Sequence, residues 1–268
     1  MIGFTLVEVL LSCMLGLLLI SLLANSYVIA EKHEALRQKL QYIQLNAETA
    51  LQLLSHDVRM AGYLGCPFLT NDFPILPYGQ ITFTPQNKLQ GQNNPNAFLS
   101  VRYLEFPHST LLRQSSYSEM IVSTPPYYKA GDILLMTNCD QAEIFQVRTV
   151  IQRDKRMYLL STTPLRNYYQ EHSELGRLLV HTYYAADTHR QGRDGRPIYA
   201  LYRANAPQHS MELVEGIDQI SVHFIERDKE GLKEVYEERN GSNVAAVKIC
   251  VYLHFENSKK ILCEYIKK

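Results

Sequence analysis

The N-terminal segment is the most apolar stretch of the chain. Residues 4–30 contain one charge, Glu8, and no proline; as an α-helix they would extend roughly 40 Å, more than the ~30 Å hydrocarbon core of a bilayer. A secretory signal peptide needs a basic segment before the apolar run and an A-x-A site after it, and neither is present here. Residues 15–23 are apolar on every face apart from Ser21, which disfavours a buried helix of a globular core. The pattern predicts a membrane-spanning helix over residues 4–30.

Beyond residue 30 the polarity changes but the helical period continues. Apolar side chains recur at steps of three and four and fall on one helical face, whereas charged side chains lie largely off that face. No proline or glycine interrupts residues 17–61, and Gly62 suits the position just past a helix C-terminus. We therefore expect one continuous helix near residues 4–61, roughly 85 Å long, with an amphipathic half over residues 31–62. Its apolar stripe comprises Leu36, Leu40, Ile43, Ala47, Ala50, Leu54, Val58 and Ala61.

A strand-like pattern follows Gly62. Prolines and the stretch at residues 91–96 first mark a long irregular connection. Alternation is clearest at residues 247–255, where every second side chain is apolar. We predict an α+β fold, in which the long helix packs on a mostly antiparallel β-sheet domain over residues 63–268. The expected strands cover residues 98–106, 120–123, 133–137, 143–151, 157–161, 178–185, 198–203, 217–226, 246–255 and 261–266, with turn signals at 192–195, 229–231 and 240–242.

Composition narrows the class of function. The chain of 268 residues carries 27 Lys and Arg against 27 Asp and Glu, so it lacks the basic excess with which nucleic-acid-binding proteins contact phosphates. Hydrophobic residues make up 46% of the chain and the most apolar of them lie at one end, which fits neither a polytopic membrane protein nor a disordered chain. The 18 Tyr and 9 Phe favour strands.

The residues Gly3-Phe4-Thr5-Leu6-Val7-Glu8, followed by the apolar run, resemble the processing motif of type IV prepilins. The resemblance implies that a prepilin peptidase cuts between Gly3 and Phe4, that residues 1–3 are a residual leader, and that Phe4 is then methylated. It also implies that Glu8 pairs with the terminal amine of a neighbouring subunit during assembly, so that each charge offsets the desolvation of the other. The alternative interpretation of Glu8 is a boundary residue whose carboxylate reaches the headgroups. Unlike most prepilin leaders, residues 1–3 carry no Lys or Arg.

Separate segments of the remaining chain resemble the PilW family of minor pilins. DVRMAGYLGC at residues 57–66 is similar to that family's helix ending, and GDILL at 131–135 with NCDQAEIFQV at 138–147 is similar to its central strand pair. LVEGID at residues 213–218 is similar to a segment shared with the GspJ pseudopilins of type II secretion. The resemblance implies a minor pilin that primes or caps a type IV pilus, in contact with other minor pilins, the major pilin, the prepilin peptidase and the inner-membrane assembly platform. It places the protein in the Gram-negative inner membrane, in contact with lipid, with a periplasmic C-terminal domain.

The five cysteines divide by location. Cys13 lies in the membrane-spanning segment and is interpreted as a small apolar residue. Cys66, Cys139, Cys250 and Cys263 lie in the part expected to face the periplasm, where disulfides persist, and they allow three connectivities. Cys250 and Cys263 flank an expected hairpin turn at residues 256–259, which favours a bridge between them and leaves Cys66 for Cys139. The alternative is four free buried thiols; a zinc site is disfavoured because no C-x-x-C occurs.

Motifs of catalysis are not found. The sequence contains no G-x-S-x-G, P-loop or G-x-G-x-x-G, and its nine His include no H-x-x-x-H pair. Residues 187–194 lack the ligand order of an EF-hand and are interpreted as a hairpin loop. We therefore expect no enzymatic activity, cofactor, metal or direct nucleic-acid contact. Two alternatives to the pilus stay open: a GspJ-like pseudopilin of type II secretion, and a membrane-anchored periplasmic binding domain that never polymerises.

Overall fold

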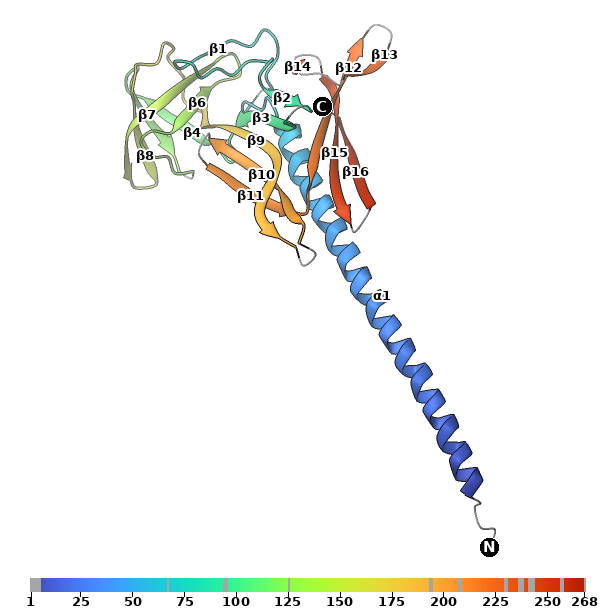
Figure 1. Cartoon of the computed structure of the whole chain (residues 1–268). Coiled ribbons are helices and arrows are strands. Elements are labelled where there is room, and N and C mark those ends of the chain that lie inside the picture. Colours follow the sequence, from blue (N-terminus) through green and yellow to red (C-terminus); the bar gives the residue numbers. More distant parts are fainter. Residues whose placement is uncertain are drawn as a thin grey trace. The chain divides into compact units, whose positions relative to one another are not determined.

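The computed structural model describes residues 6–66, 68–93, 96–124, 126–192, 195–206, 209–228, 231–235, 239–240, 244–255 and 258–267. Its first element is a single helix, α1 (Leu6–Met60), which can be followed from the blue end of the ribbon in Figure 1. After the helix, the described chain consists of strands and their connections. This arrangement confirms the predicted α+β fold, a long N-terminal helix packed against a mostly antiparallel β-sheet domain.

Helix α1 ends at the glycine that the sequence indicates. Gly62 has a φ of +80°, a left-handed conformation that glycine adopts without strain. The Tyr63 amide donates to the Met60 carbonyl at 2.8 Å, and the Gly62 amide donates to the carbonyl of Arg102 in β3 (Phe98–Leu104) at 2.9 Å. The chain is therefore joined to a strand as soon as it leaves the helix.

By compactness the chain divides into two units, Met1–Asn46 and Ala47–Lys268. The first contains the N-terminal part of α1, and the second combines the last turns of α1 with all the described strands. The division falls inside the amphipathic half that the sequence places at residues 31–62. The last turns of the helix thus belong to the β-rich unit.

The larger of two sheets is built around one long strand. It contains β1 (Ile75–Leu76), β2 (Leu89–Gln92), β3, β4 (Ser109–Gln114), β5 (Glu119–Ser123), β6 (Ile133–Thr137), β7 (Ala142–Arg153), β8 (Arg156–Ser161), β9 (Glu174–Gln191), β10 (Pro197–Ala206), β11 (His209–Glu215) and β14 (Arg239–Asn240). The strand order is β1-β7-β8-β5-β4-β9-β3-β2-β14, with β6, β10 and β11 paired beside this path. Strand β9 pairs antiparallel with β3, β4, β6 and β10, whereas β1 and β7 run parallel.

The smaller sheet has the order β13-β12-β15-β16 and is antiparallel throughout. Its strands are β12 (Gln219–Asp228), β13 (Gly231–Val235), β15 (Val244–Phe255) and β16 (Ser258–Lys267). In β15 the alternate residues Val247, Ile249, Val251 and Leu253 are all buried, as the period of two in the sequence predicts. One face of this sheet therefore packs in the hydrophobic core.

Each of the ten expected strands is present, but the structure has further strands and one strand that is longer than expected. The strands that were not predicted are short or have a polar composition with a weak strand signal; they are β1, β2, β4, β11, β13 and β14. The interpretation of residues 187–191 as loop was wrong, because these residues continue β9, where Asp187 pairs with Tyr199 of β10 and Gln191 with Pro197. The hairpin is real but its loop is shorter, since cross-strand backbone pairing outweighs the turn propensity of Asp and Gly; residues 193–194 lie outside the described part of the chain.

The core of the β-rich unit includes the last turns of α1. Ala47, Ala50, Leu54 and Val58 are each 0% exposed, so the C-terminal part of the predicted apolar stripe is buried. A second cluster fills the space between β4, β5, β6, β7 and β8 and includes Leu111, Met120, Val122, Phe145, Val147, Met157 and Leu159. A third cluster packs Leu64, Leu69 and Phe83, from the segment that follows the helix, against Leu104, Leu135 and Ile144 of β3, β6 and β7.

Candidate functional site

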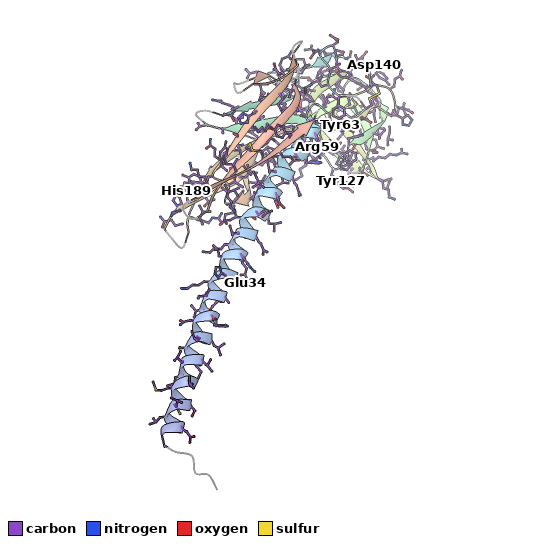
Figure 2. The ribbon with its side chains drawn as sticks, turned by 90° about the vertical axis from the view of Figure 1, so that its right-hand side faces the viewer. Glu34, Arg59, Tyr63, Tyr127, Asp140 and His189 are labelled. Carbon is purple, nitrogen blue, oxygen red and sulfur yellow. A yellow bond between two sulfur atoms is a disulfide. The ribbon has the colours of Figure 1, made fainter. Side chains whose placement is uncertain are left out.

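The first unit presents apolar side chains rather than burying them. From Leu10 to Ile29 the large apolar residues are 45–71% exposed, and side chains stand out around the helix on either side of Glu34 in Figure 2. Transfer of such a surface from water to hydrocarbon is favourable by on the order of 20 kcal/mol at ~25 cal/mol per Å². By length and composition α1 can cross a membrane, which fits a membrane anchor or a signal sequence.

Glu8 lies in the first turn of α1 and is exposed. The positive end of the helix dipole favours a carboxylate at this position. In hydrocarbon an ionised carboxylate costs a few kcal/mol unless it is paired, so a partner at the same depth stabilises it. Gly3 and Phe4, the residues predicted to be processed, lie outside the described residues.

Asp57 is a carboxylate within the buried face of α1, and it is 4% exposed. Its Oδ1 accepts a hydrogen bond from the Tyr103 hydroxyl of β3 at 2.9 Å. Its Oδ2 accepts from the Tyr183 hydroxyl of β9 at 2.6 Å and lies 2.5 Å from Nδ1 of His181, also in β9. Because a carboxylate only accepts, we assign the proton of this contact to Nδ1. Donors from two strands thus converge on one helix side chain, and we call these four residues the Asp57 cluster.

The electrostatics of the Asp57 cluster favour an ionised carboxylate. Burial raises the pKa of Asp57, but hydrogen bonds from His181 and Tyr183, the attraction of His181 and the Tyr103 bond outweigh it, so the pKa lies below its usual 3.8. Burial and the charge of Asp57 raise the pKa of both tyrosines, although Arg203, opposite Tyr183 on β10, opposes the rise. Both hydroxyls therefore keep their protons and donate.

The Asp57 cluster was not identified from the sequence, although a signal exists. Asp57 lies three residues after Leu54 and one before Val58, so it falls within the apolar stripe where a carboxylate is costly unless its hydrogen bonds are satisfied. Hydrogen bonds to a charged group contribute roughly 1.5–3 kcal/mol each. The cluster fastens the last turns of α1 to β3 and β9 more strongly than their small alanines alone would.

The segment after α1 is fixed by a disulfide between Cys66 and Cys139, the loop disulfide, with Cα atoms 5.7 Å apart. Cys139 lies in the turn between β6 and β7, where Oδ1 of Asn138 accepts from the amides of residues 140 and 141 at 3.1 and 2.8 Å. Gly65 has a φ of +104°, and a Cβ there would stand 1.6 Å from Oε2 of Glu174. Glycine is thus required next to the loop disulfide.

A second disulfide, the strand disulfide, joins Cys250 of β15 to Cys263 of β16. The two residues are direct cross-strand partners with Cα atoms 4.1 Å apart. Both disulfides follow the pairing that the sequence favours, whereas Cys13 is a free, exposed thiol. Because disulfides persist in oxidising compartments, the two bridges indicate that the β-rich unit is extracytoplasmic.

The predicted site residues do not form one centre. The structure brings the four cysteines of the β-rich unit together in pairs, while Glu8 lies in the other unit. Within the described ranges, no group of three or more His, Cys, Asp or Glu side chains is arranged to hold a metal ion. The main features of the described residues are structural: an apolar helix, a buried ionic cluster at its end and two disulfides. No model of a known protein family, no curated protein and no solved structure matches the chain.

Proposed function

We propose that the chain is a minor pilin, similar to the PilW family, that acts in the priming or tip complex of a type IV pilus. The observation that carries the proposal is α1, one uninterrupted helix whose first part exposes apolar side chains and whose last turns are buried in the β-rich unit. Such a helix can stay in lipid or pack among other apolar helices while the β-rich unit remains outside the membrane. The prepilin-like motif covers residues 3–8 of the sequence, and α1 begins at Leu6, within this motif.

In the proposed cycle, a prepilin peptidase cuts between Gly3 and Phe4 and the new amine of Phe4 is methylated. The protein waits in the Gram-negative inner membrane with its β-rich unit in the periplasm. The assembly platform then moves the helix among those of other minor pilins and of the major pilin. There the Glu8 carboxylate pairs with the amine of a neighbouring subunit, and each charge offsets the desolvation of the other. The role is structural, and it uses no catalytic group, cofactor, metal or direct nucleic-acid contact.

The junction between helix and strands supports this role. A subunit that is moved by its helix must carry its β-rich unit along, so the two parts need connections that resist pulling. The Asp57 cluster joins α1 to β3 and β9, and the loop disulfide joins the segment after α1 to the β6–β7 turn.

A GspJ-like minor pseudopilin of type II secretion is the second candidate. It is favoured by residues 213–218, which end β11 and lead into β12 through Gly216 at a φ of +85°. The same helix would then enter a different machine. Deletion of the gene separates the two candidates, because loss of surface pili with normal secretion supports the pilus and the opposite result supports the pseudopilin.

The N-terminal residue of the protein recovered from membranes tests the proposal. Mass spectrometry should find N-methyl-Phe4 in cells with an active prepilin peptidase and an uncut chain in a Gly3→Val variant. Gly16→Ala is the matched control, because this glycine lies in the same helix with nothing within 4 Å of an added Cβ and should leave cleavage unchanged. A wild-type chain that stays uncut, in cells that process other prepilins, would instead support a membrane-anchored periplasmic binding domain that never polymerises.

A further inference from the structure

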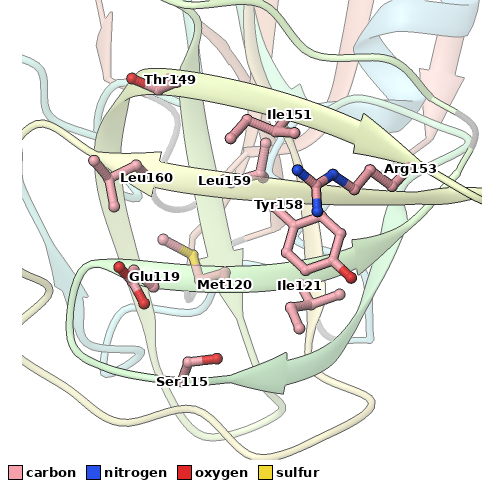
Figure 3. A pocket seen from close by; sticks show the side chains of 10 residues that line it. All are labelled: Ser115, Glu119, Met120, Ile121, Thr149, Ile151, Arg153, Tyr158, Leu159 and Leu160. Atoms are coloured by element: carbon pink, nitrogen blue, oxygen red, sulfur yellow. The ribbon is translucent and has the colours of Figure 1, made fainter.

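The outer face of β5, β8 and β7 carries an apolar groove of about 480 Å³ (Figure 3). The inner face of these strands is buried in the cluster around Met120 and Met157, so solvent-facing positions would ordinarily be polar. Instead, Ile121, Tyr158 and Ile151 form a row across the three strands, as direct cross-strand partners. Ile151 is 49% exposed and Tyr158 is 38% exposed. An apolar row flanked by charged residues is typical of a contact surface.

The two ends of the groove carry opposite charges. Glu119 lies at one end, where its cross-strand partner is Leu160. At the other end Arg153 lines the groove and is directly opposite Arg156. Like charges in direct cross-strand positions are destabilising, and among the described residues neither arginine has a carboxylate within 4.0 Å. The arrangement is unfavourable in the isolated chain, and an acidic group placed over both guanidinium groups would relieve it.

The spacing of the charges defines the length of the occupant. Arg156 and Leu160 are four residues apart on β8, which corresponds to ~13 Å at ~3.3 Å per residue. An extended peptide that lies along the strands would therefore match both ends if its acidic and basic side chains were about four residues apart. The anionic group of an amphiphile could pair with the two arginines. Its apolar tail, however, would end at Glu119 and provide no positive charge to pair with that carboxylate. The charges thus favour a peptide.

We propose that this groove is a docking site for an extended segment of a partner protein, apolar at its centre, with an acidic side chain over Arg153 and Arg156 and a basic side chain at Glu119. The apolar centre of the segment crosses the row of Ile121, Tyr158 and Ile151 and packs on it. Figure 3 shows the side chains of Arg153, Tyr158 and Ile151 gathered at the same end of the groove. The groove is formed by strands alone, so its occupant does not depend on what α1 inserts into.

Three fluorescent five-residue peptides test the charge pattern against the full chain in phosphatidylcholine nanodiscs. The first is Glu-Leu-Val-Ile-Lys, and the others carry Glu at both ends or Lys at both ends. Since exposed charge pairs contribute roughly 0.2–1 kcal/mol each, the wild type should bind the first peptide about three- to tenfold more tightly than the other two. The double variant Arg153→Glu/Arg156→Glu should prefer the Lys/Lys peptide, and Glu119→Lys should prefer the Glu/Glu peptide.

Arg148→Glu is the matched control, because Arg148 is an exposed arginine of β7 that does not line the groove, and it should not change the preference. All the substituted side chains are exposed, and near-UV circular dichroism verifies that each variant is folded. The proposal is overturned if the three peptides bind equally, if the variants keep the wild-type preference, or if no peptide binds up to about 1 mM. It is also overturned if dodecanoate displaces the peptides and binds more tightly than any of them, which would assign the groove to an amphiphile.

Discussion

Replacement of Asp57 by Asn is expected to weaken the β-rich unit through the loss of one negative charge. Asn keeps the shape of the side chain and can present its oxygen to Tyr183 and His181, which lie 2.6 and 2.5 Å from Oδ2 of Asp57. The amide group of Asn then faces the Tyr103 hydroxyl, which must accept a hydrogen bond from it. The proton of the Tyr103 hydroxyl no longer has a carboxylate as its acceptor. The substitution therefore separates the contribution of charge from that of packing.

The magnitude follows from the difference between charged and neutral hydrogen bonds. A bond to a charged group contributes roughly 1.5–3 kcal/mol and a neutral one roughly 0.5–1.5 kcal/mol. Each of the three bonds changes from a charged to a neutral hydrogen bond and is weakened by about 1 kcal/mol, so the free energy of unfolding should fall by about 3 kcal/mol. For a unit of this size the corresponding fall in Tm is roughly 6–12 °C.

Unfolding of the full chain by guanidinium, in detergent and without reductant, measures this loss. Near-UV circular dichroism is the suitable signal, because the chain has 18 Tyr and no Trp. Asp72→Asn makes the same chemical change at an exposed turn position and should change the stability by less than about 0.5 kcal/mol. A loss as small as that of the control in Asp57→Asn would show that the cluster adds little to the stability.

The pH dependence gives the reasoning a second, sharper test. The folded-state pKa of Asp57 lies below its usual 3.8, so its stabilisation is complete above about pH 4 and is lost as the pH falls through the folded value. Once protonated, wild-type Asp57 is neutral like Asn, and the difference between the two proteins should shrink towards zero. A difference that is equal at pH 7 and pH 2.5 would refute the assignment of the effect to the ionised carboxylate.

Three further predictions concern the segment after the helix, the disulfides and the membrane-facing helix. Gly65→Ala should lower the free energy of unfolding by about 2–3 kcal/mol, because the φ of residue 65 is strained for alanine and the Glu174 side chain must move. Gly131→Ala is the control, because Gly131 has a similar φ but open space around an added Cβ; it should lower the free energy of unfolding by about 1 kcal/mol in the same assay. Replacement of both cysteines by serine should lower the free energy of unfolding by about 4 kcal/mol for the loop disulfide and about 3 kcal/mol for the strand disulfide, because their sequence separations are 73 and 13. Non-reducing peptide maps check the pairing. Equal or reversed losses would contradict the chain-entropy reasoning. Glu8→Leu should remain in the membrane but be absent from sheared pili by immunoblot, whereas Glu34→Leu should be incorporated; normal incorporation of Glu8→Leu would remove its proposed role.

The elements that sequence analysis predicted well are those whose signal is local. The helix expected near residues 4–61 is Leu6–Met60, because period, length and the terminal glycine are all read within a few turns. Strand β6 (Ile133–Thr137) has its expected bounds because its apolar run is short and enclosed by polar residues. Such patterns are set by the backbone's own periodicities and need no knowledge of distant partners.

The Asp57 cluster could not be predicted in the same way, because its members are distant in the sequence. Tyr103, His181 and Tyr183 lie 46, 124 and 126 residues from Asp57. Their meeting depends on β3 and β9 being neighbours, which is a property of strand order and not of any local window. Arg153 and Arg156 are close in the sequence, but their direct cross-strand pairing depends on the register of the β7–β8 hairpin, which the sequence analysis did not assign.

The Asp57 cluster also determines where α1 sits along its axis. The buried positions Ala47, Ala50, Leu54 and Val58 repeat every three or four residues, so a helix displaced by one turn would still offer an apolar face to the strands. A one-turn displacement would move Asp57 by ~5.4 Å, beyond hydrogen-bonding reach of both tyrosines and His181, and would leave a carboxylate buried without donors. An uncompensated buried charge costs several kcal/mol, so the displaced register is disfavoured by the carboxylate alone. The apolar residues therefore hold the helix against the strands, and the single carboxylate fixes its position along its axis.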